Sequence, residues 1–136
     1  MLDSDFAAEL LSRARAAAAR AYAPYSNFPV GAAILTEDGT IFEGANIENA
    51  SYPVTMCAER VAAGAAIFAG HREFRAVAVS APRSPGATPC GVCRQLLNEF
   101  KPDSGETIVI LDQPGGPEQM PLSALMPRAF GPRDLE

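Results

Sequence analysis

Three cysteines are the residues of this 136-residue chain whose spacing most clearly suggests chemistry. Cys90 and Cys93 form a Cys-x-x-Cys pair, and Cys57 precedes a second apolar helix-like segment. All three are expected at helix N-termini, where free N–H groups and a partial positive charge lower the pKa of a thiol. Three thiolates from two helix starts would supply the protein ligands of a catalytic zinc site and leave a fourth position for water.

Glu59 follows Cys57 by two residues at the same predicted helix start. A carboxylate beside a zinc-activated water can take up a proton and return it to a substrate. Taken alone, Glu59 is more simply an acid that stabilises a helix N-terminus, and the cysteines could be a redox pair or small core residues. The combination of the three thiols with Glu59 favours the catalytic interpretation.

A structural zinc site with a fourth protein ligand is the alternative, and His71 is the only histidine available for it. His71 lies 14 residues beyond Cys57, at the far end of the same predicted helix. At about 1.5 Å per residue this separation is roughly 20 Å. We therefore expect His71 to be a solvated residue at the helix end.

Hydrophobic periodicity and turn residues predict the elements that position these side chains. Helices are predicted at 3–21, 56–69 and 90–100, and strands at 30–35, 40–44, 74–80 and 107–111, with a short strand or helix at 120–125. The first two strands form a predicted hairpin. This order of elements predicts a layered α/β domain with helices packed on a mixed sheet.

Two of the predicted helices have an apolar stripe that we expect to be buried. In the first helix the stripe consists of Phe6, Leu10, Ala14, Ala17 and Ala21. In the second it consists of Val61, Ala65 and Phe68, and Gly70 is expected to end the helix.

Composition limits the class of protein. A hydrophobic content of 48% suffices for a proper core, and the length predicts a single domain over residues 1–136. The net charge of −5 disfavours nucleic-acid binding, which needs a basic surface. No apolar run approaches the roughly 18 residues of a membrane span, and the acidic start is unlike an export signal. We expect a cytoplasmic protein with reduced thiols.

Several segments resemble a known family. Cys57-Ala58-Glu59-Arg60 and residues 89–95 (PCGVCRQ) are similar to the two-part signature of zinc-dependent cytidine deaminases. Residues 22–34, residues 46–53 (NIENASYP) and the ending AFGPRDL resemble the short, homotetrameric, three-cysteine branch. The resemblance covers nearly the whole chain and implies a three-layer αβα cytidine-deaminase-like fold, with a mixed five-stranded sheet flanked by helices.

The resemblance also implies a reaction, the hydrolytic deamination of cytidine and deoxycytidine to uridine and deoxyuridine in pyrimidine salvage. Zn²⁺ on Cys57, Cys90 and Cys93 would activate water for attack at C4 of cytosine. Glu59 would protonate N3 and then pass a proton to the departing amine. Arg60 would donate hydrogen bonds to the thiolates, and the case for Arg94 is weaker.

Substrate-binding residues follow from the same resemblance. Asn46 and Glu48 stand at i and i+2, so both side chains are expected to leave a strand end on one face and to bind the 3′-hydroxyl of the sugar. This contact would accept ribose or deoxyribose alike. Phe28 would line the pocket. The residues that would reach into the site of a neighbouring subunit, making a homotetramer with shared sites, are Ala50, Tyr52 and Phe130.

Other hypotheses share part of this pattern. A deaminase of a cytosine-bearing nucleoside antibiotic has the same zinc core, and an editor of polynucleotides would need a basic channel. A binding module with a structural zinc would need a fourth protein ligand, and a thiol redox protein would not need Glu59. The proline-rich loop 81–89 and residues 54–56 depart from the family pattern, and the loop could alter access to the site.

Overall fold

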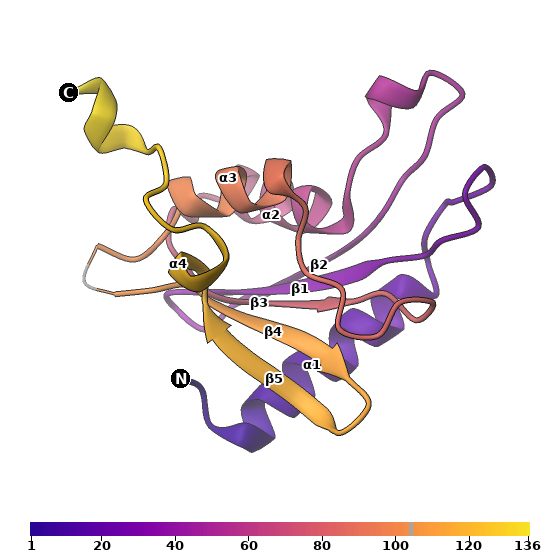
Figure 1. Cartoon of the computed structure of the whole chain (residues 1–136), viewed down its shortest axis with the longest axis horizontal. Helices are drawn as coiled ribbons and strands as arrows, with labels where there is room; N and C mark the ends of the chain where they lie inside the picture. Colours follow the sequence, from indigo (N-terminus) through magenta and orange to yellow (C-terminus); the bar gives the residue numbers. More distant parts are fainter. Residues whose placement is uncertain (104) are drawn as a thin grey trace.

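A five-stranded sheet forms the centre of the computed structural model, which describes residues 1–103 and 105–136 (Figure 1). The strand order is β2-β1-β3-β4-β5. The pair β3–β4 is parallel and the other neighbours are antiparallel. The strands are β1 (Gly31–Thr36), β2 (Ile41–Ala45), β3 (Phe74–Ser80), β4 (Ile108–Gln113) and β5 (Gly116–Pro121). The predicted hairpin is the pair β1–β2, and the prediction of a mixed sheet is confirmed.

Helices cover both faces of this sheet (Figure 1). The long helix α1 (Ser4–Ala18) lies on one face, and α2 (Ala58–Phe68) and α3 (Gly91–Glu99) lie side by side on the other. The short elements are α4 (Leu122–Leu125) and the 3₁₀ turns η1 (Tyr52–Val54) and η2 (Pro132–Leu135). The predicted three-layer αβα fold is therefore confirmed.

Side chains of the central strands alternate between the two cores, because successive residues of a strand point to opposite faces. In β3, Val77 and Val79 contact the core beneath α2 and α3, whereas Ala76 and Ala78 contact the core beneath α1. Both faces of β3 are thus buried, which explains its continuous apolar run.

Helix α1 is shorter than predicted. The Asp3 carboxylate caps its start by accepting a hydrogen bond from the Phe6 N–H at 3.3 Å, and the helix ends at Ala18 rather than at residue 21. Beyond a short turn, the Tyr22 N–H donates to the Asn46 carbonyl at 3.0 Å, which draws the chain into pairing beside the sheet. Of the predicted stripe, the three central residues are buried, and Phe6 and Ala21 are half-buried.

The stripe predicted for the second helix is wrong. Phe68 is 96% exposed and Ala65 is exposed, whereas the buried residues that face the sheet are alanines, namely Ala58, Ala62, Ala63 and Ala66. The cause is a close approach at Gly44 of β2, where an added Cβ would lie 2.6 Å from the Ala58 carbonyl oxygen. A helix this close to the sheet accommodates only alanine-sized side chains. Its predicted stop is confirmed, since Gly70 has a φ of 103°.

The C-terminal region contains both elements that were left open as alternatives. β5 forms a hairpin with β4, and α4 follows it directly. None of the helices in the described part of the chain is long and apolar enough to cross a membrane.

Candidate metal centre and substrate cavity

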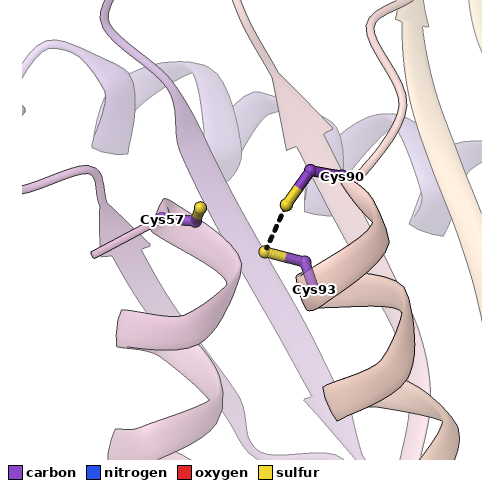
Figure 2. Close-up of side chains that lie close together, drawn as sticks. All are labelled: Cys57, Cys90 and Cys93. Atoms are coloured by element: carbon purple, nitrogen blue, oxygen red, sulfur yellow. Dashed lines mark hydrogen bonds between the residues drawn. The ribbon is translucent and has the colours of Figure 1, made fainter. Parts of the chain in front are cut away.

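Two helix starts bring the three cysteines together (Figure 2). Cys57 is the N-cap of α2, Cys90 is the N-cap of α3, and Cys93 lies in the first turn of α3. Their sulfur atoms all lie within 4.8 Å of one another, and the Cys90 and Cys93 sulfurs are 3.6 Å apart. The predicted placement of the thiols at helix N-termini is confirmed.

The topology of the sheet explains this convergence. α3 connects the parallel strands β3 and β4, so its N-terminus follows the carboxyl end of β3. α2 lies beside it on the same face of the sheet. The carboxyl ends of parallel strands and the adjoining helix N-termini are where α/β proteins commonly bind ligands.

The three thiols differ in their electrostatic surroundings. Burial raises the pKa of Cys57 and of Cys93, and the charges of Glu59 and of the neighbouring thiols raise both further. Burial acts in the same direction on Cys90, but hydrogen bonds from Cys93 and from the Val92 N–H bring its pKa below the ordinary value. Since neighbouring thiolates repel one another, a bound cation is what would keep all three ionised.

The donor set fits zinc. Three protein ligands leave the fourth position of a tetrahedral zinc site open, and thiolates select soft or borderline cations. Among residues 1–103 and 105–136, the group that could hold a metal ion consists of these three cysteines.

His71 lies outside this group. Its ring packs against Phe42 with centroids 5.3 Å apart, and its Nδ1 lies 3.5 Å from the Glu37 carboxylate. The expectation of a solvated histidine is wrong, because the side chain is only 15% exposed. The hypothesis of a structural zinc with His71 as fourth ligand has no support in this geometry.

Glu59 is the second residue of α2 and is only 4% exposed. Burial raises the pKa of its carboxyl group, whereas hydrogen bonds from its own backbone and from Cys93 act in the opposite direction. It lines the same cavity as Cys57 and Cys90. A carboxyl group in such a place can hold and release a proton beside the sulfur cluster.

The cavity above the cluster has a volume of about 210 Å³. Phe28, Val30 and Asn46 line its wall. The Asn46 amide donates to the Phe28 carbonyl and accepts from the Val30 N–H, both at 2.9 Å. Asn46 therefore fixes the backbone of one wall while facing the cavity.

Glu48 lies in an adjoining hollow that is lined by Tyr25, Ser26, Tyr52 and Thr55. Its carboxylate accepts hydrogen bonds from the Tyr25 N–H at 2.9 Å and from the N–H and hydroxyl of Ser26. Asn46 and Glu48 thus both contact the segment 25–30. They face different hollows, and Thr55 lines both of these.

Three further predicted residues lie at the surface. Tyr52 is 71% exposed, Phe130 is 58% exposed, and Ala50 is exposed in the loop before η1. None of the three lines the cavity above the cysteines in the described part of the chain. Their action on a neighbouring subunit stays a prediction.

The two candidate arginines, Arg60 and Arg94, differ in the hydrogen bonds that they form. Arg60 is half-buried and forms no hydrogen bond or ion pair with the residues that the structure describes, so its predicted donation to the thiolates stays a prediction. Arg94 donates to one carbonyl and one hydroxyl of the loop that leads to Cys90 and to the Leu125 carbonyl at the end of α4. Donation from Arg94 to the thiolates stays a prediction, and its contacts with these oxygen atoms were not predicted. A usable signal was its position four residues after Cys90, because helical side chains point back toward the helix N-terminus.

The proline-rich loop also contributes unpredicted residues to the cavity wall, namely Ala81, Ala87 and Thr88. Their position between the end of β3 and the start of α3 was the available signal, since ligands gather at such crossovers.

Comparison with known proteins agrees with this geometry. Residues 4–109 match the family model described as the cytidine and deoxycytidylate deaminase zinc-binding region. A cytidine deaminase of Sporosarcina psychrophila is 44% identical over 127 residues, which cover 93% of either chain. The 1.6 Å crystal structure of cytidine deaminase from Burkholderia pseudomallei matches with a TM-score of 0.81 and 43% identity, over 90% of this chain and 97% of that one. The crystal structure of cytidine deaminase from Mycobacterium tuberculosis matches with a TM-score of 0.79 and 39% identity, over 96% and 99%. This chain belongs to the zinc-binding family of cytidine and deoxycytidylate deaminases.

Proposed function

We propose that this protein deaminates cytidine and deoxycytidine by hydrolysis, as a nucleoside-salvage enzyme. The observation that carries the proposal is a three-thiol cluster, two of whose cysteines line one cavity together with a buried carboxyl group. Membership of the deaminase family supports it, and so do the names of the relatives and of the structural neighbours.

Cys57, Cys90 and Cys93 would hold the zinc ion. When bound, zinc supplies a Lewis acid that makes water nucleophilic near neutral pH. Arg60 would turn toward the thiolates and offset their charge.

Glu59 would handle the protons. Its carboxylate takes a proton from the attacking water and delivers it to N3 of the cytosine ring as the oxygen bonds to C4. It then takes the proton of the new C4 hydroxyl group and transfers it to the amine, so the C4–N bond breaks, ammonia leaves and the C4 carbonyl forms. Water and cytidine thus give uridine and ammonia. Burial suits Glu59 to this role, because it raises the pKa of the carboxyl group and so favours uptake of a proton.

The base would occupy the cavity above the cysteines, with Phe28 against it. The sugar would lie toward Thr55, where the cavity and the hollow of Glu48 share a wall residue. Asn46 and Glu48 would bind the 3′-hydroxyl from that side, which leaves the 2′ position free and lets the site accept both cytidine and deoxycytidine.

A second copy of the chain would complete the site. Ala50, Tyr52 and Phe130 are exposed and would enter the site of a neighbour in a homotetramer. Light scattering on the purified protein tests this assembly, and a monomer with full activity would contradict it.

Three further expectations belong to the proposal. Residues 1–136 would fold as one domain, the protein would act in the cytoplasm with reduced thiols, and it would not bind nucleic acid.

The deciding experiment mixes purified protein with cytidine or deoxycytidine and follows the ultraviolet absorbance, with metal content measured on the same sample. A fall in cytidine absorbance by a protein with about one zinc per chain would support the proposal. Zinc without turnover of either nucleoside would contradict it and direct attention to base-modified nucleosides.

A further inference from the structure

Arg94 is the polar side chain most heavily engaged around the cysteine cluster. It follows Cys93 directly in α3 and is half-buried. Its Nε donates to the Pro89 carbonyl at 2.7 Å, its Nη2 to the Thr88 hydroxyl at 2.8 Å, and its Nη1 to the Leu125 carbonyl at 2.7 Å. One guanidinium therefore joins α3 to the loop before Cys90 and to the end of α4.

The loop before Cys90 has few other attachments near its end. Three of its residues are prolines and have no N–H to donate. Further back, the Gly86 N–H donates to the Asp112 carbonyl and the Arg83 guanidinium donates to the Asn27 carbonyl, and both bonds anchor the loop. The described hydrogen bonds at Thr88 and Pro89 both come from Arg94.

Cys90 depends on this anchor more than the other two cysteines do. Cys93 is buried inside α3 and Cys57 is half-buried at the start of α2, whereas Cys90 is exposed and precedes its helix. Packing therefore restrains Cys90 least. The position of its sulfur follows from the conformation of the peptide that Arg94 holds.

Arginine suits this task better than lysine. Its planar fork presents five N–H donors in fixed directions, so it can bind three acceptors at once, whereas lysine offers one compact ammonium group. We propose that Arg94 is a positioning residue that holds the Thr88–Pro89 peptide so that Cys90 stays in place to retain the metal ion. This inference rests on the proposed role of the three cysteines as zinc ligands.

The test measures how fast zinc passes from the loaded protein to a chromophoric chelator. The variants are Arg94→Ala and Arg94→Lys, with Arg15→Ala as the matched control. Arg15 also makes two hydrogen bonds, both to Asp112, but it lies on α1 across the sheet. Arg15→Ala therefore also removes arginine hydrogen bonds, but at a place away from the cysteine cluster.

We expect Arg94→Ala to release zinc about tenfold faster or more, the loss typical of residues that orient metal ligands. Arg94→Lys should recover little of this loss, and methylguanidinium added to Arg94→Ala should slow the release. Arg15→Ala should release zinc at the wild-type rate. A wild-type rate in Arg94→Ala, or an equal acceleration in Arg15→Ala, would overturn the inference.

Thr88→Val keeps the test decisive if Arg94→Ala does not fold. It removes one of the three acceptors and leaves the arginine in place. Release about fivefold faster is expected for the loss of one such hydrogen bond, and an unchanged rate would overturn the inference. This test can fail separately from the proposed activity. If zinc release depends on Arg94 but the protein does not turn over cytidine, only the proposed activity is contradicted. If the protein turns over cytidine but zinc release does not depend on Arg94, only the inference is contradicted.

Discussion

The base of the cavity and the adjoining hollow of Glu48, which forms the rim of the site, are built by different means. At the base, Cys57, Cys93 and Glu59 stand on the first turns of two helices that pack on the sheet, and Glu59 is almost wholly enclosed by its own chain. At the rim, Tyr25 and Tyr52 pack edge to face with ring centroids 6.0 Å apart, and both are more than half exposed.

This difference separates two tasks. Groups that must act on reacting atoms need fixed positions, which helices packed on a sheet provide. Groups that recognise a substrate can lie on loops, and a second chain can add further groups to the binding site. Changes at the base should therefore abolish turnover or metal binding, and changes at the rim should act on substrate affinity.

The largest effect is expected at Glu59. Replacement by glutamine keeps the shape of the side chain but removes its ability to transfer protons, so turnover should fall by about 10⁴-fold. Zinc content and the thermal midpoint should change little, because glutamine fills the same space and the three cysteines stay in place. The ultraviolet assay with metal analysis on the same sample checks this. Activity within tenfold of the wild type would remove Glu59 from the mechanism.

Cys90→Ala is the next largest change at the base. Two thiols hold zinc far less well than three, so the variant should lack both metal and activity. Its thermal midpoint should match that of wild-type protein stripped by a chelator, because metal binding contributes to folding stability. Scanning calorimetry of both samples with and without chelator provides the measurement. If the chelator lowered the thermal midpoint of the variant as much as that of the wild type, Cys90 would not be a zinc ligand.

Asn46→Ala tests the boundary between base and rim. The substitution leaves the Phe28 carbonyl and the Val30 N–H without their partner, so stability should fall by about 1–3 kcal/mol. KM for cytidine should rise about tenfold or more if the amide also binds the sugar. Chemical denaturation and steady-state kinetics give the two quantities. A loss of stability with unchanged KM would make Asn46 purely structural.

Tyr52→Ala should act on the rim alone. Since the side chain is largely exposed, the free energy of unfolding should change by less than about 0.5 kcal/mol. Zinc content should be unchanged, and KM should rise a few-fold if Tyr52 enters a neighbouring site. Kinetics at several protein concentrations, beside light scattering, check this. Wild-type KM in an intact tetramer would exclude Tyr52 from substrate binding.

The smallest effect is expected away from both regions, at Asp112. The Arg15 guanidinium, helped by the Ser80 hydroxyl, lowers the pKa of this carboxyl group against the opposing effect of burial. The folded state therefore gains stability above the ordinary carboxyl pKa and loses it as the pH falls through the lowered value.

Asp112→Asn should accordingly cost about 1 kcal/mol near neutral pH, and this difference from the wild type should shrink as the pH falls below about 4. Denaturation curves across this range measure it, and KM should be unchanged throughout. If the difference in the free energy of unfolding grew as the pH fell, the Arg15–Asp112 ion pair would not be its source.

Local signals in the sequence predicted most elements and the whole sulfur cluster. Cys57 and Cys90 precede apolar helical segments, and helix starts depend on neighbouring residues, so these placements needed no knowledge of the fold. The buried face of α2 could not be predicted in this way. Val61, Ala65 and Phe68 have the apolar spacing, but the approach allowed by Gly44 selects the alanine face instead.

The sequence by itself determined which chemistry is available, because thiols at helix starts and a carboxylate two residues away are set by short-range order. Only the tertiary structure decided which distant residues hold the side chains of the site in place. Arg94 binds Leu125, which is 31 residues away, and Glu48 binds Ser26, which is 22 residues away. Such partners meet only after strand pairing has brought distant segments together, so neither contact can be deduced from local sequence.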